Sequence, residues 1–122
     1  MTTEELIAKC PDEVVELATA SNSLIAKTLP DVIEFTDEKA NLIGYGYSNK
    51  YIDLVCTIRL SKKGVKIGLN RGTELPDPSK LLTGTSKVHN YVQILTLKDL
   101  KDPAVKALLK EGYKAWKIRS KA

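Results

Sequence analysis

Three consecutive strand-like segments constrain the fold more than any other feature of the sequence. Aromatic and branched residues favour a strand over residues 42–47, and apolar side chains recur at every second position over residues 51–60 and 65–69. A period of two is typical of a strand that is buried on one side only. Short turns join the segments, so the sequence predicts an antiparallel meander with one solvent-exposed face. In the second turn, Gly64 is expected to supply a positive φ.

Residues 89–96 predict a fourth strand. Tyr91, Gln93 and Leu95 are expected on one face and Val92 and Ile94 on the other. The glycine and prolines within residues 70–79 predict an irregular loop there. Residues 80–82 are expected to form a single helical turn. Residues 31–41 are expected to form a polar connector.

Two longer helices are expected on either side of these strands. The first covers residues 11–29, where Pro11 suits the first turn and Pro30 ends the helix. The second covers residues 103–118, behind an Asp-Pro start signal. A short helix is expected before the first one, up to about Cys10. The predicted fold is therefore α+β in two layers, with a four- to five-stranded antiparallel sheet and helices on one face, as a single domain over residues 1–122.

The composition excludes several classes of protein. The 122 residues are 43% hydrophobic and 28% charged, which is ordinary for a globular domain. No apolar run reaches the roughly 20 residues of a membrane helix, and the acidic start lacks the features of a signal peptide. We therefore expect a cytoplasmic protein with no membrane partner.

Catalytic motifs are missing from the sequence. His89 is the single histidine, and the two cysteines, Cys10 and Cys56, lie far apart in no metal-binding spacing. Cys56 is expected inside the sheet as a small core residue, and both thiols are expected to be unpaired. No phosphate-binding or dinucleotide-binding glycine motif occurs. The sequence thus favours a protein that is not an enzyme.

The charges are distributed unevenly along the chain. Residues 1–40 hold nine acidic and three basic residues, a net charge of −6, whereas residues 41–122 hold six acidic and sixteen basic residues, a net charge of +10. Carboxylates are the preferred ligands of hard cations. The candidate metal site consists of five acidic residues near the first two helices: Glu4, Glu5, Asp12, Glu13 and Glu16.

The basic half offers an alternative site for anions. Backbone N–H groups and side chains of the loop before the fourth strand could form a small anion nest, with Arg71, Thr85, Ser86 and Lys87 as candidate residues. Four further basic residues surround the second hairpin: Arg59, Lys62, Lys63 and Lys66. Tyr45, Tyr47 and Tyr51 could offer stacking surfaces beside them. Basic and aromatic side chains together are what single-stranded nucleic acid uses, although no nucleic-acid module signature occurs.

Three motifs resemble the YdhG-like family of small bacterial and archaeal proteins of unknown function. They are Gly-x-x-Leu-Pro-Asp-Pro at residues 72–78, Leu-Leu-x-Gly-Thr-x-Lys at 81–87 and Val-x-Ile at 92–94. With the helix ending at Pro30 and the tyrosine-containing hairpin, the resemblance spans nearly the whole chain. It implies a frataxin-like fold and an intracellular iron chaperone, with no tightly bound cofactor, weakly held iron, and iron-accepting proteins as partners. A small-anion or nucleic-acid binding module is the alternative function.

Overall fold

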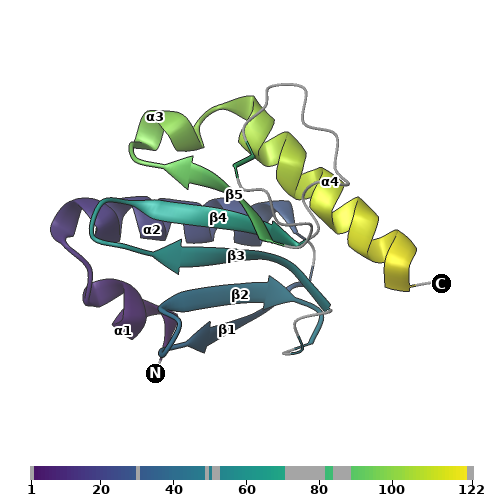
Figure 1. The fold of residues 1–122 in the computed structure, drawn as a ribbon, viewed down its shortest axis with the longest axis horizontal. Coiled ribbons are helices and arrows are strands. Elements are labelled where there is room, and N and C mark those ends of the chain that lie inside the picture. Colours follow the sequence, from purple (N-terminus) through teal and green to yellow (C-terminus); the bar gives the residue numbers. More distant parts are fainter. Residues whose placement is uncertain are drawn as a thin grey trace.

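A five-stranded antiparallel sheet in the order β1-β2-β3-β4-β5 forms one layer of the protein, and helices form the other (Figure 1). The computed structural model describes residues 2–29, 31–48, 50, 53–70, 82–83 and 89–120, without the side chains of residues 70, 89, 119 and 120. The elements in chain order are α1 (Thr3–Ala8), α2 (Asp12–Thr28), β1 (Ile33–Asp37), β2 (Leu42–Gly46), β3 (Leu54–Leu60), β4 (Val65–Asn70), β5 (His89–Ile94), α3 (Leu97–Leu100) and α4 (Pro103–Ser120). The predicted α+β class and antiparallel sheet are confirmed.

Helices α1, α2 and α4 begin where the sequence predicts. Thr2 and Glu5 form a capping box at α1, in which each side chain accepts a hydrogen bond from the backbone N–H of the other. Pro11 is the N-cap of α2. At α4, Oδ1 of Asp102 accepts a hydrogen bond from the backbone N–H of Ala104. Both longer helices bury one apolar side against the sheet, and Gly112 lets α4 approach within van der Waals distance of Leu69 and Val55 on the strands.

The prediction of a polar connector over residues 31–41 is wrong in its central part. Ile33–Asp37 is strand β1, which pairs with all five residues of β2. Asp31 and Asn41 take positive φ angles of 50° and 55° just outside this strand. Residues 32–37 do not alternate in polarity because β1 lies at the edge of the sheet, where Ile33 stays 49% exposed. The strand therefore depends on pairing with β2 and leaves no clear local pattern.

Two details of the hairpins also differ from expectation. Gly64 has no positive φ; a side chain there would collide with the backbone carbonyl oxygen of Ile94. The last predicted strand ends at Ile94 rather than residue 96, because Thr96 and Asp99 form a capping box that starts α3. The glycine-rich β2 also contains an irregularity, a register shift at Tyr45 and Gly46.

The core lies between the sheet and helices α2 and α4. Residues that pair across neighbouring strands lie on the same face of the sheet. On the face that packs against the helices, such pairs form buried rows across β2 to β5, one of which consists of Ile43, Ile58, Ile67 and Val92. Cys56 and Cys10 are free thiols, and Cys56 is buried in this core as predicted. Within the residues that the structure describes, no helix combines the length and the hydropathy that a membrane span requires.

Candidate binding face

The side of the sheet that faces away from α2 and α4 carries polar and basic residues, and we call it the open face. Its residues on β3, β4 and β5 are Thr57, Arg59, Lys66, Gly68, Tyr91 and Gln93. All six are half-buried or exposed, while the residues that alternate with them are buried. The antiparallel register places them in two neighbouring rows, so this face is a continuous surface about three strands wide.

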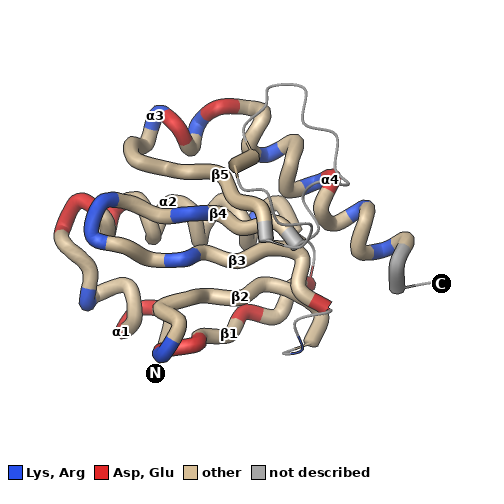
Figure 2. Tube along the Cα trace, viewed as in Figure 1, with Lys and Arg blue, Asp and Glu red and all other residues tan. Residues whose placement is uncertain are grey.

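Positive charge dominates the open face over these strands. Arg59 and Lys66 are direct cross-strand partners, and Lys62 and Lys63 are exposed in the turn between their strands. Neither residues 54–70 nor residues 89–94 contain an aspartate or a glutamate. Figure 2 shows this basic turn and the basic positions on β3 and β4, with acidic segments on α1 and β1. Like charges that face each other across a strand pair are destabilising.

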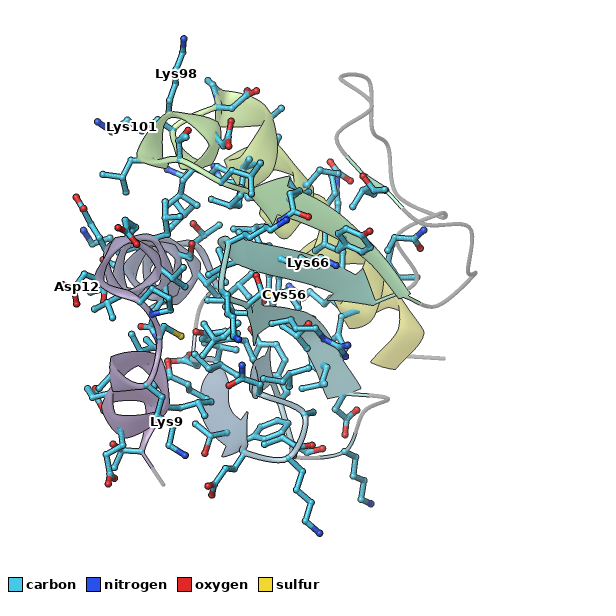
Figure 3. The ribbon with its side chains drawn as sticks, turned by 60° about the vertical axis from the view of Figure 1, so that its left-hand side comes forward. Lys9, Asp12, Cys56, Lys66, Lys98 and Lys101 are labelled. Atoms are coloured by element: carbon cyan, nitrogen blue, oxygen red, sulfur yellow. The ribbon has the colours of Figure 1, made fainter. Side chains whose placement is uncertain are left out.

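Tyr91 adds an aromatic ring to the same surface. The Nζ atom of Lys66 lies 4.6 Å from the centre of that ring, which is the geometry of a cation–π contact. Tyr91 is also held on its outer side, where Thr83 pairs with it through two backbone hydrogen bonds of 2.7 and 3.0 Å. In Figure 3, Lys66 lies over the strands of the sheet, whereas Lys98 and Lys101 point outward from α3.

Tyr91 belongs to a row with aromatic ends and small residues between them. The register gives the row as Phe35, Gly44, Thr57, Gly68 and Tyr91. The tip of the Phe35 ring lies over Gly44, where a methyl group would approach its Cζ to 2.6 Å. In the same way, the Thr57 hydroxyl occupies the space above Gly68. The space above both glycines is therefore occupied, by the Phe35 ring at Gly44 and by the Thr57 hydroxyl at Gly68.

The neighbouring row changes charge from one end to the other. It runs through Asp37, Leu42, Arg59, Lys66 and Gln93. Asp37 lies on the edge strand β1, and its Oδ1 accepts a hydrogen bond from the backbone N–H of Ala40. An anion on the open face would therefore be repelled at β1 and attracted at β3 and β4.

The five acidic residues of the predicted metal site are exposed on α1 and α2. In the part of the chain that the structure describes, no three histidine, cysteine, aspartate or glutamate side chains come together in a way that could hold a metal ion. Asp12, Glu13 and Glu16 share the first turns of α2, and Glu4 and Glu5 belong to α1. The Glu5 carboxylate is used in the capping box, and the hydrogen bond from the Thr2 backbone lowers its pKa.

The predicted anion nest cannot be placed. Arg71, Thr85, Ser86 and Lys87 lie outside the described residues, as do residues 80 and 81 of the expected helical turn.

Two of the three tyrosines proposed for stacking, Tyr45 and Tyr47, play other roles. Tyr45 faces the core, where its hydroxyl oxygen accepts a hydrogen bond from Asn22 Nδ2 at 3.0 Å, and burial raises its pKa strongly. Tyr47 stacks on Trp116 of α4, with ring centres 4.1 Å apart. Tyr51 lies outside the described residues. Tyr91 was not considered for stacking, although the alternation of the fourth strand already placed it opposite the buried Val92 and Ile94.

A family model described as a domain of unknown function, DUF5655, matches residues 3–115 of the chain. That description carries neither the YdhG-like nor the frataxin-like name that the motifs suggested. Comparisons with curated proteins and with solved structures returned no match.

Proposed function

The chain belongs to the DUF5655 family, a domain of unknown function, and from its geometry we propose that it is a non-enzymatic binding protein whose open face takes phosphate-bearing anions. The observation that carries this proposal is the direct opposition of Arg59 and Lys66 on adjacent strands. Such a pair costs stability in the free protein. An anion bound between the two side chains would attract both cations and so offset their mutual repulsion.

The surroundings of the pair support an anion in particular. The strands that carry it contain no acidic residue, and the adjoining turn adds Lys62 and Lys63. Phosphate oxygens accept charge-assisted hydrogen bonds from guanidinium and ammonium groups, which are stronger than neutral ones. We place the protein in the cytoplasm, since both cysteines are free thiols.

A non-enzymatic role accords with the chemistry of the described residues. The single histidine and the two cysteines belong to separate elements, and Cys56 is buried in the core. The open face offers cations, a phenol ring and an amide, which bind and orient a ligand. Thr57, Lys66 and Tyr91 carry a hydroxyl, an amine and a phenol, but no histidine, cysteine or carboxylate is among the six residues to activate one of them.

Iron carriage by the acidic helices ranks behind this proposal. Its ligands would be the exposed carboxylates of α1 and α2, with iron-accepting proteins as partners. Exposed carboxylates keep their water, so such binding would be weak and would select poorly among divalent cations. The described residues bring no three of them together, whereas the basic residues of the open face share one surface.

Calorimetric titration with inorganic tripolyphosphate tests the proposed function. We expect saturable binding that Arg59→Gln and Lys66→Gln each weaken by about fivefold or more. Lys110→Gln removes an equal charge from the exposed side of α4 and should change the affinity by less than about twofold. Absence of binding, or equal losses in all three variants, would contradict the proposal.

A further inference from the structure

We infer that the ligand of the open face is single-stranded nucleic acid, with a base stacked on Tyr91 and phosphates on the Arg59–Lys66 row; this rests on the proposed function. The two rows of the open face differ in chemistry. One presents cations and the amide of Gln93, and the other presents aromatic rings and small residues. A nucleotide has the same division into an anionic and a planar apolar part.

The spacing of the rows fits that division. Rows of the same face lie two residues apart along a strand, which is about 6.6 Å. A phosphate held by Arg59 and Lys66 therefore leaves its base within reach of Thr57, Gly68 and Tyr91 in the next row. A base in this position can contact the face of the Tyr91 ring, the face that Lys66 contacts in the free protein.

The cation–π contact shows that this ring already accepts a partner on its face. Lys66 lies 4.6 Å from the ring centre in the free protein. Base stacking on aromatic rings beside basic residues is the common mode of single-strand recognition. On binding, Lys66 can turn toward a phosphate while the base takes its place over the ring.

The shape and charge of the face argue against other anions. Duplex DNA is read by elements that enter its grooves, and the open face is a sheet surface with its rings among the strands. A small free anion needs converging donors, but here the cations extend from the Arg59–Lys66 pair to Lys62 and Lys63 in the turn. An extended polyanion contacts all four. Asp37 on β1 repels phosphate at the far end, so we expect the strand to lie over β3, β4 and β5.

Fluorescence anisotropy with labelled oligonucleotides of about twelve residues tests this inference. Separate arms with oligo(dT), oligo(U) and a duplex of equal length distinguish DNA, RNA and paired strands. We expect at least one single-stranded probe to bind more tightly than the duplex. Tyr91→Leu should weaken that binding about fivefold or more, Tyr91→Phe should retain it, and neither should change tripolyphosphate affinity more than about twofold.

The outcomes separate the inference from the proposed function. Tripolyphosphate binding without oligonucleotide binding overturns the inference and leaves the proposed function standing. Duplex binding as tight as single-strand binding, or full affinity in Tyr91→Leu, also overturns it. If neither tripolyphosphate nor any oligonucleotide binds, both fail. Circular dichroism of each variant establishes that Tyr91→Leu is folded, and Tyr91→Phe supplies the comparison if it is not.

Discussion

Arg59 and Lys66 face each other across β3 and β4, an arrangement in which Coulomb repulsion opposes folding. The open face supplies no carboxylate on these strands to offset the repulsion. Lys66 gains a partner in the Tyr91 ring. The residue whose removal relieves repulsion while keeping that contact is therefore Arg59.

We predict that Arg59→Gln raises the free energy of unfolding by about 0.2–1 kcal/mol while it weakens anion binding. Urea denaturation at low salt measures the gain. Added salt should reduce it, because exposed charges are screened. Lys110→Gln is the charge-matched control and should show a smaller change. A loss of stability in Arg59→Gln at low salt would show that the cross-strand pair is not strained.

The two thiols differ in their surroundings, and their reactivity should differ accordingly. Burial raises the pKa of both, and Cys56 is enclosed by the core while Cys10 is half-buried. The thiolate is the reactive species. We predict that a thiol reagent modifies Cys10 first and reaches Cys56 at the rate of unfolding. A Cys10→Ser variant isolates the second reaction, and its rapid labelling in the native protein would contradict the assignment of strand faces.

At the scale of elements, close approaches of backbone determine where glycine is required. A side chain at Gly64 would meet the carbonyl oxygen of Ile94 on the neighbouring segment, which cannot move without disturbing β5. At Gly68 the obstacle is the hydroxyl of Thr57, which can rotate away. The two glycines therefore differ in how far the structure can adapt.

We predict that Gly64→Ala lowers the free energy of unfolding by about 1–3 kcal/mol. Gly68→Ala should cost clearly less, because a side-chain rotation relieves its contact and alanine loses less backbone entropy than glycine on folding. Urea denaturation of both variants measures the difference. Equal costs would indicate that the turn beside Ile94 adapts as readily as a side chain does.

The contact between the end of β2 and helix α4 should respond to alkaline pH. Burial is the main cause that raises the pKa of Tyr47 from its ordinary value of 10.0 to about 12. The folded protein thus holds this proton more tightly than the unfolded chain. The contribution of the protonated Tyr47 to the free energy of unfolding is fully present below about pH 10 and declines as the pH rises from about 10 to 12.

Tyr47→Phe removes that ionisation and keeps the ring that stacks on Trp116. We predict that the variant loses less stability than the parent between about pH 9 and pH 11. Thermal unfolding followed by circular dichroism at both values measures the difference. A parent and a variant that fall in parallel would contradict the raised pKa.

At the scale of the whole molecule, local patterns predicted the sheet well where short turns connect its strands. Aromatic and branched residues predicted β2, and the alternation over residues 51–69 predicted β3 and β4 and their faces, because a two-residue period and a tight turn together define the register. Strand β1 was not predicted because its few residues are stabilised by pairing with β2, which is distant information that the local sequence does not contain. Helix α3 is a four-residue segment whose capping box was not recognised.

The two candidate sites also differ in how far local sequence patterns could predict them. Helical spacing predicted that Asp12, Glu13 and Glu16 approach one another on one helix, but in the described residues no three acidic side chains form a group that could hold a metal ion. The open face depends on register across three strands. Arg59 and Lys66 were noted as part of a basic hairpin, yet their opposition and the position of Tyr91 beside Lys66 follow only from the pairing of β3, β4 and β5.

The central claim, that the open face binds phosphate-bearing anions, is tested most directly by mapping the bound surface. Amide chemical shifts of the intact protein, recorded during titration with inorganic tripolyphosphate, report which backbone groups change environment. We predict the largest changes at Thr57, Arg59, Lys66, Gly68, Tyr91 and Gln93, with little change on α1 and α2. Changes confined to the helical layer, or none at saturating ligand, would contradict it.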